Sequence, residues 1–170
     1  MRILEIGPDG HPSTYQAIVR DSSIAWETLD IYPSEELTYL AKDEYTFPIP
    51  DGTFDIVFSA QVIEHVRKVW LWTKEVARVC KQGGYVITIN PVSWPYHEAP
   101  IDCWRIYPDG MRTLYEEAGI RVQLAKHESL SSSGWIYPVY LLKEAIKPIM
   151  LRGSPMWGPV IDTISIGVKG

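Results

Sequence analysis

Near its N-terminus the chain reads I L E I G P D G H P S T Y (residues 3–15), and the order of these residues indicates an α/β fold. A short apolar run, typical of a buried strand, leads into a Gly-Pro-Asp-Gly turn, and a polar segment that can open a helix follows. These are the first parts of a nucleotide-binding βαβ unit, in which amides at the helix start face an anionic group. The two glycines lack the G-x-G-x-x-G spacing of a dinucleotide site, so they alone identify no cofactor.

Segments with strand-like and helix-like patterns alternate after this opening. Apolar and β-branched runs predict strands at Arg2–Ile6, Ala25–Ile31, Phe54–Ala60, Tyr85–Ile89, Ile120–Ala125 and Ile161–Val168, with a weak element at Leu37–Leu40. Apolar spacing and capping residues predict helices at Ser13–Arg20, over most of Val62–Cys80 up to Gln82-Gly83-Gly84, at Asp109–Glu117 and at Ile136–Ile149. This alternation implies a mostly parallel sheet covered on both faces, the doubly wound α/β class, which binds ligands beyond the carboxyl ends of its strands.

The composition fits a single domain that spans residues 1–170. The chain carries 16 basic and 21 acidic residues and no basic run, which gives nucleic-acid binding no electrostatic support. No apolar run approaches the ~18 residues of a membrane span and no signal peptide is recognisable, so we expect a cytoplasmic protein with no membrane contact. Of the two cysteines, Cys80 has the setting of a small buried hydrophobe, and Cys103 has no neighbour that would make it reactive.

Acids close to the opening turn help to separate two candidate cofactors. Asp30, at the end of the second predicted strand, can accept hydrogen bonds from both hydroxyls of a ribose, which suits NAD and S-adenosylmethionine alike. A dinucleotide site needs glycines for close approach to a pyrophosphate, where this chain has Asp9 and His11, and an anionic Asp9 would repel that group. Glu5 is also unfavourable beside a pyrophosphate but well placed near an ammonium or a sulfonium. The balance favours S-adenosylmethionine.

Four segments together carry a family resemblance. They are L E I G P (4–8), T L D I (28–31), K D E Y T F P I P D G T F D I V F S A Q V I E H V (42–66) and E V A R V C K Q G G Y V I T I N P (75–91). In order and spacing they resemble the class I S-adenosylmethionine-dependent methyltransferases, most closely the bacterial small-molecule methyltransferases, from about residue 2 to about residue 122. The resemblance implies a Rossmann-like, doubly wound sheet of seven mostly parallel strands with an antiparallel last strand, and S-adenosylmethionine as cofactor.

The resemblance also implies which residues contact the cofactor. They are Glu5, Gly7 and Pro8 at the methionine end, Asp30 and Ile31 at the ribose, Asp43, Glu44 and Tyr45 at the adenine, and Ser59, Ala60 and Gln61 beneath the methionyl moiety. Glu64 and His65 match a recurring pair whose role is often structural. Asp9 and His11 stand where the family has its second and third glycines. Because the first predicted strand starts at residue 2, we expect the usual N-terminal cap helices to be missing. A partner subunit, a second copy of the chain, segment 126–160 as a lid or interface, or nothing would then close the site.

The stretch P V S W P Y H E A P I D C W R I Y (91–107) is a long proline- and aromatic-rich loop, and in this family that region commonly faces the acceptor. We predict His97 as the general base, because an imidazole titrates near neutrality. Asp102 would orient it or bind an acceptor hydroxyl, and Arg105 would pair with an acidic substrate group; alternatively, the two form a salt bridge that holds the loop. The residues predicted to form an apolar wall are Tyr96, Trp104 and Tyr107. His97, Glu98 and Asp102 fit no strong metal-binding pattern, so no metal is predicted.

These residues predict a methyltransferase that acts on a small-molecule acceptor, at the oxygen of a sugar, a glycoside or another natural product. Nitrogen or carbon as the acceptor atom stays open. One alternative is a non-catalytic cofactor-binding or partner-binding domain of the same fold, and a second is a nicotinamide-dependent oxidoreductase. A nucleic-acid base methyltransferase is disfavoured, because its N/D-P-P-Y/F signature should follow F D I V F S, where this chain has A Q V I E H.

Overall fold

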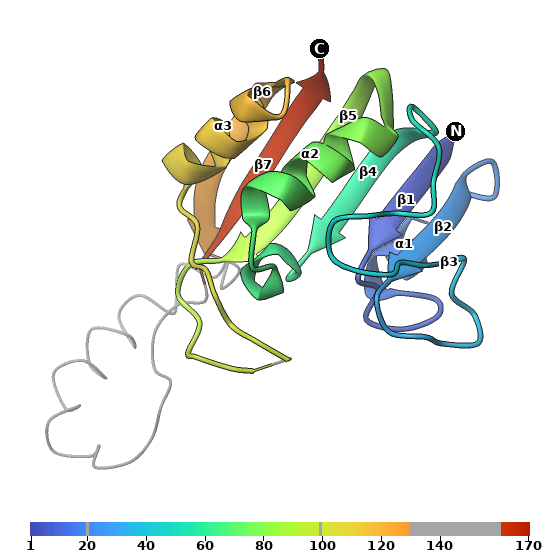
Figure 1. Cartoon of the computed structure of the whole chain (residues 1–170), viewed down its shortest axis with the longest axis horizontal. Helices are drawn as coiled ribbons and strands as arrows, with labels where there is room; N and C mark the ends of the chain where they lie inside the picture. The colour runs from blue at the N-terminus through green and yellow to red at the C-terminus, as the bar shows by residue number, and fades with distance from the viewer. Residues whose placement is uncertain (20, 99, 130–160) are drawn as a thin grey trace, which may run out of the picture.

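The computed structural model describes residues 1–19, 21–98, 100–129 and 161–170, and these form a seven-stranded sheet with the strand order β3-β2-β1-β4-β5-β7-β6 (Figure 1). The strands are β1 (Arg2–Ile6), β2 (Ala25–Asp30), β3 (Tyr39–Leu40), β4 (Phe54–Ala60), β5 (Cys80–Pro91), β6 (Ile120–Ser129) and β7 (Ile161–Lys169). The helices are α1 (Thr14–Ile18), the 3₁₀ turn η1 (Ile63–His65), α2 (Val69–Val79) and α3 (Pro108–Glu117). None of these described helices is long and apolar enough to cross a membrane.

Strand directions confirm the predicted fold class. The neighbours from β3 to β5 pair in parallel, whereas β7 lies between β5 and β6 and is antiparallel to both. The chain moves outward from β1 through β2 to β3 and then returns to β4 on the other side of β1. A sheet of this kind has its binding crevice where the direction of winding reverses, which here is at the carboxyl ends of β1 and β4.

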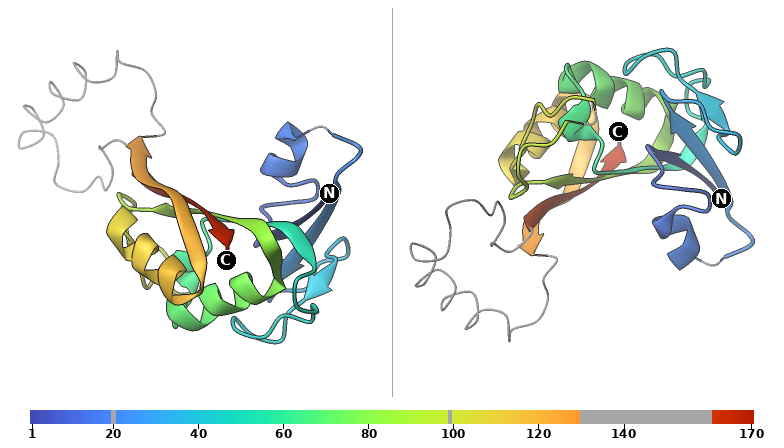
Figure 2. Two further views of the ribbon diagram at one scale, coloured as in Figure 1. Left: turned by 90° about the horizontal axis from the view of Figure 1, so that it is seen from above. Right: turned by 90° about the horizontal axis from the view of Figure 1, so that it is seen from below.

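The sheet carries helices on both faces, but unevenly. Figure 2 shows α2 and α3 side by side on one face and the short α1 on the other. The main hydrophobic core lies beneath α2 and α3, and its buried members include Leu4, Ile6, Leu29, Val57, Trp72, Val76, Val86, Met111 and Tyr115. On the opposite face, the ring of Tyr15 in α1 packs edge-on against Phe58 of β4, with ring centroids 4.6 Å apart.

The helix predicted over most of Val62–Cys80 is shorter than the apolar spacing indicates. Gln61 adopts a left-handed backbone conformation with φ 56°, and the chain then makes the 3₁₀ turn η1 before α2 begins at Val69. Ile63, Val66 and Val69 are all buried, so the apolar pattern continues through a segment that is not an α-helix. The helix also ends at Val79 rather than at the later glycines, which lie within β5.

Other element boundaries differ less from the prediction. Ser13 is the N-cap of α1, and its hydroxyl accepts a hydrogen bond from the Gln16 amide at 3.1 Å, but the helix ends at Ile18. The predicted strand at Ile120–Ala125 continues to Ser129, so that the first residues of segment 126–160 belong to β6. The rest of that segment, with the helix predicted at Ile136–Ile149 and the proposed lid or interface, lies outside the described residues.

We expect a thiol reagent to separate the two cysteines. Cys80 is fully buried where α2 meets β5, and burial raises the pKa of its thiol to about 11, whereas Cys103 is exposed. Because the thiolate is the reactive form, Ellman's reagent at pH 8 is expected to titrate one thiol per native chain and two in concentrated guanidinium chloride. Rapid reaction of both thiols in the native protein would contradict the packing of α2 against β5.

Candidate functional site

A cavity of about 270 Å³ lies at the predicted place, beyond the ends of β1, β2 and β4. Of the residues predicted to contact the cofactor, those that line this cavity are Gly7, Asp30, Ile31, Glu44 and Gln61. Sequence reasoning did not assign the apolar residues beside them, which include Leu29, Phe47, Val62 and Trp72. The cavity therefore combines apolar walls with a few polar groups at strand ends, as small-molecule sites commonly do.

Gly7 makes the turn that brings the backbone close to the cavity. Its φ is +69°, and its amide donates a 2.9 Å hydrogen bond to the carbonyl of Leu29 in the neighbouring strand. A Cβ at this position would lie 2.5 Å from Cγ2 of Val62. Only glycine fits both the left-handed conformation and the close approach to the segment that follows β4.

The acid at the end of β2 also faces the cavity. Asp30 is half-buried, and its Oδ1 accepts a 2.9 Å hydrogen bond from the Tyr32 amide, which fixes the turn after the strand. Ile31 and Tyr32 follow it and present exposed apolar surface at the same cavity. The strand end thus offers a carboxylate beside an aliphatic and an aromatic side chain, a combination that suits a nucleoside.

Glu5 does not line the cavity. It is buried on the α1 side of the sheet, where Oε2 accepts hydrogen bonds from the Ser13 hydroxyl at 2.5 Å and from the Trp26 indole at 2.7 Å. Asp9, which takes a glycine's place in the family pattern, accepts from the amide and the hydroxyl of Thr14. Glu5 thus holds Ser13, the N-cap of α1, against β1, and Asp9 holds Thr14, the first residue of α1, against the opening loop.

The predicted adenine segment contributes one of its three residues to the cavity lining. Glu44 lines the cavity, and its carboxylate forms an ion pair with Arg67 at 2.8 Å and accepts from the Tyr45 hydroxyl at 2.7 Å. Asp43 is exposed and binds the Tyr45 amide instead. Asp43 and Tyr45 lie outside the lining, and so do the predicted Pro8, Ser59 and Ala60.

Asp162 is a polar residue of this edge that sequence reasoning missed. Gln61 donates a 3.0 Å hydrogen bond to Oδ2 of Asp162, although the two residues are far apart in the sequence. Asp162 is buried at the start of β7, and burial raises the pKa of its carboxyl above the ordinary value. The antiparallel course of β7 brings its first residues to the carboxyl ends of the parallel strands, and no local sequence signal carries that information.

The charged pair predicted in the long loop is formed. Arg105 binds Asp102 with two parallel hydrogen bonds of 2.5 and 2.6 Å, and the Asp102 side chain is 2% exposed. The backbone amide of His97 also donates to Asp102, at 2.8 Å. Hydrogen bonds from Arg105 hold the pKa of the Asp102 carboxyl far below its ordinary value. Arg105 additionally binds the carbonyls of Trp94 and Pro95, so the pair holds the loop, as the salt-bridge alternative predicts.

The three aromatic residues predicted as an acceptor wall do not come together. Tyr96 is 72% exposed and donates to Glu98, and it shares a shallow depression with Trp104. Trp104 donates its indole N–H to the carbonyl of Val66 at 2.8 Å. Tyr107 stands before α3 and lines a different depression, beside β6. Aromatic content alone could not reveal this, because the loop directs neighbouring side chains apart.

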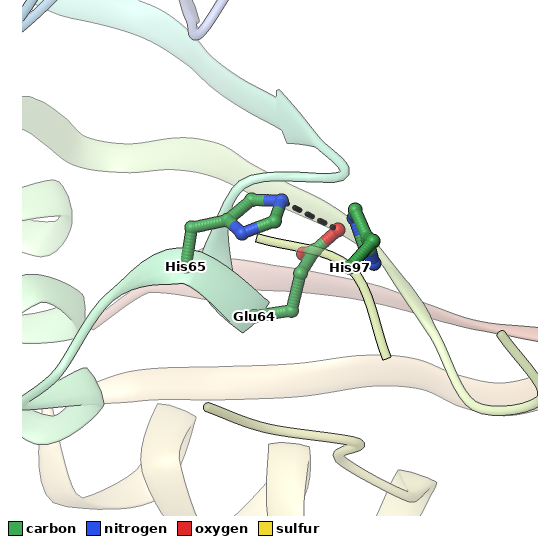
Figure 3. A group of neighbouring side chains, drawn as sticks. All are labelled: Glu64, His65 and His97. Carbon is green, nitrogen blue, oxygen red and sulfur yellow. Dashed lines mark ion pairs between the residues drawn. The ribbon is translucent and has the colours of Figure 1, made fainter. Parts of the chain in front are cut away.

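His97, the predicted base, is not among the residues that line the cavity. The cavity is lined instead by His65, and the two imidazole rings meet edge to face with centroids 4.9 Å apart (Figure 3). Glu64 completes this cluster, and its carboxylate is buried between the two rings. Burial raises the pKa of Glu64 to about 7. The sequence indicates Glu64 and His65 as a recurring pair but gives no sign that His97 would meet them.

Part of the sequence is similar to known proteins. Residues 19–88 match the family model described as "Methyltransferase domain". A curated relative, 2-methyl-6-phytyl-1,4-hydroquinone methyltransferase of Synechocystis sp., is 26% identical over 72 residues, which cover 42% of this chain and 23% of the relative. The chain thus spans less than a quarter of the length of that relative.

Solved structures share the fold over nearly the whole chain. A SAM dependent methyltransferase from Aquifex aeolicus superposes with a TM-score of 0.63 at 16% identity and covers 100% of this chain and 82% of its own. The [4+2]-cyclase SpnF superposes with a TM-score of 0.65 at 15% identity and covers 99% of this chain and 75% of its own. Residues 19–88 are thus similar to a methyltransferase domain, and the chain shares the fold of S-adenosylmethionine-dependent methyltransferases.

Proposed function

We propose that the chain is a methyltransferase that binds S-adenosylmethionine in the 270 Å³ cavity and methylates a small molecule, at the oxygen of a sugar, a glycoside or another natural product. One observation carries the proposal: the cavity lies at the reversal point of the sheet, between the Gly7 turn and the Asp30 carboxylate. His65 and Pro100 line the same cavity, and we assign this part of the wall to the acceptor.

The residues present fit this cofactor. A Cβ at Gly7 would occupy the narrow space between the turn and Val62. The acids around the cavity, Asp30 and Glu44, suit a ligand with a net positive charge. Asp30 would accept hydrogen bonds from the ribose hydroxyls, and Ile31 with its neighbours would cover the adenine. Asp43 and Tyr45 stay predicted adenine contacts on the loop next to Glu44.

The cofactor supplies an electrophilic methyl group on a sulfonium sulfur. The protein has to hold the acceptor atom in line with that group and to exclude water, and a hydroxyl acceptor also requires removal of a proton. His65 lines the cavity and its ring meets that of His97, so a proton taken up at this wall could be held by either imidazole. His97 remains the predicted base, and Asp102 and Arg105 are its positioning residues through the loop that they hold.

Calorimetric titration with S-adenosylmethionine and S-adenosylhomocysteine tests the proposal. We expect saturable binding at one site per chain, weakened about 10- to 100-fold in Asp30→Ala, because hydrogen bonds to a charged group contribute about 1.5–3 kcal/mol. Asp109→Ala is the matched control, since Asp109 is 98% exposed on α3. Failure of the folded wild-type protein to bind either compound would contradict the assignment.

A second candidate is a domain of this fold that binds the cofactor without transferring its methyl group. The similarity to a [4+2]-cyclase supports this second candidate, because that protein has the same fold and is named for a reaction other than methyl transfer. Turnover distinguishes the two: release of S-adenosylhomocysteine with a panel of phenols, sugars and glycosides supports the transferase. Tight binding of the cofactor with no release across hydroxyl, amine and carbon acceptors supports the alternative.

A further inference from the structure

Glu64, His65 and His97 bring three metal-ligating groups together from two parts of the chain. Glu64 and His65 belong to η1, and His97 belongs to the loop between β5 and α3 (Figure 3). Each residue offers one ligand atom, and these three atoms all lie within 4.8 Å of one another. Oε1 of Glu64 lies 3.7 Å from Nε2 of His65. In the other combination, His97 with Glu98 and Asp102, both carboxylates already have partners, because Glu98 binds Tyr96 and Asp102 binds Arg105.

The carboxylate of Glu64 needs a partner. The residue is 1% exposed, and neither Oε1 nor Oε2 accepts a hydrogen bond from the described part of the chain. An ionised carboxylate buried in this way is costly unless it is paired or coordinates a metal. Its oxygens face the space between the two imidazoles (Figure 3), so that a cation there would satisfy it.

Both histidines are prepared as metal ligands. Nδ1 of His65 lies 2.5 Å from the carbonyl oxygen of Ile101, which only accepts, so Nδ1 carries the hydrogen and Nε2 keeps its lone pair beside Glu64. Nδ1 of His97 lies 3.2 Å from the carbonyl oxygen of Pro95 and 3.3 Å from Oδ2 of Asp102. Metal-ligating histidines typically donate their second ring nitrogen to a carbonyl or a carboxylate in this manner.

We propose that Glu64, His65 and His97 bind one divalent cation of the zinc class through two imidazole nitrogens and one carboxylate oxygen. Two nitrogen ligands favour zinc over magnesium or calcium, which prefer oxygen. Zinc bonds of about 2.0–2.2 Å set tetrahedral ligand atoms about 3.3–3.5 Å apart, so the three side chains close slightly around the ion. Three protein ligands leave a fourth position, and His65 lines the cavity, so that a water or an acceptor oxygen can take it. While the ion is bound both imidazoles are ligands, so the role of His97 as general base applies to the metal-free protein.

The test is a zinc titration of the full-length chain after treatment with a chelator and its removal, in the absence of any other ligand. Competition against a zinc-sensitive dye is expected to give one tight site per chain. Glu64→Gln and His97→Ala are expected to weaken it at least 10-fold, since loss of an outer partner alone typically costs 10- to 100-fold. Glu98→Gln and His127→Ala are the matched controls, because both residues are exposed and lie outside the cluster.

Two further readouts separate loss of the site from loss of the fold. The visible absorption of bound Co²⁺ reports a tetrahedral site with nitrogen ligands, and it is expected in the wild type and absent in Glu64→Gln. Saturating zinc is expected to raise the Tm of the wild-type protein but not that of Glu64→Gln, whose folding is checked by circular dichroism. The proposal is overturned if the folded wild type takes up no zinc, or if uptake persists in both ligand variants. Loss of uptake in His127→Ala instead would assign the zinc to a surface site.

Discussion

Gly7→Ala is expected to remove measurable binding of S-adenosylmethionine and to lower the free energy of unfolding by about 2–5 kcal/mol. Two causes act together. A left-handed backbone with φ +69° costs a residue with a side chain about 1–2 kcal/mol, and the new Cβ would lie 2.5 Å from Cγ2 of Val62. To relieve that contact, the turn or the segment after β4 has to move, and residues of both line the cavity. Urea denaturation and calorimetric titration measure the two effects.

Variants at two other positions separate these causes. Gly10→Ala is the matched control, because the nearest atom that its Cβ would meet is 3.7 Å away and no left-handed conformation is involved, so we expect a change within about 0.5 kcal/mol. Val62→Ala added to Gly7→Ala removes the contact but not the backbone strain, and is expected to recover part of the cofactor affinity. A Gly7→Ala protein that binds the cofactor as tightly as the wild type would show that the turn does not approach Val62 closely.

The fold could be predicted because its strands are short apolar runs bounded by turn residues. The predicted bounds of Phe54–Ala60 agree with the structure, since its centre is the apolar run Ile56–Phe58 and Asp51-Gly52 marks its start. The start of α2 could not be predicted from the apolar spacing in the same way. Ile63 and Val66 are buried whether the backbone is a 3₁₀ turn or an α-helix, so apolar spacing does not distinguish the two.

The positions of site residues could be predicted at the ends of parallel strands, and much less in the loops. Gly7 and Asp30 reach the cavity because the carboxyl ends of β1 and β2 meet at one edge. Glu5 precedes Ile6, which lines the cavity, but the alternation of the strand turns Glu5 to the opposite face, toward Ser13 and Trp26. The meeting of His97 with η1 depends on how a long loop folds back, which local pattern does not encode.

Glu64→Gln is expected to raise the free energy of unfolding of the chelator-treated protein at pH 8 by about 3 kcal/mol. Burial raises the pKa of Glu64 from an ordinary 4.5 to about 7, and each pKa unit corresponds to about 1.36 kcal/mol. The folded state therefore binds this proton more tightly than the unfolded state. The contribution of the carboxyl to stability is full below pH 4.5 and is lost as the pH rises through about 7. Urea denaturation from pH 4 to pH 8 measures it.

The sign of this effect rests on the groups that face Glu64. His97 and Arg105 favour the ionised carboxyl and Asp102 disfavours it, but burial outweighs them all. The amide that replaces the carboxyl in Glu64→Gln is neutral at every pH, so the two proteins should be about equally stable at pH 4 and diverge toward pH 8. Glu117→Gln is the control, since Glu117 is exposed at the end of α3. A variant less stable than the wild type at pH 8 without metal would mean that the ionised carboxyl has a favourable partner. Saturating zinc should reverse the order, because only the wild type then gains the energy of the bound ion.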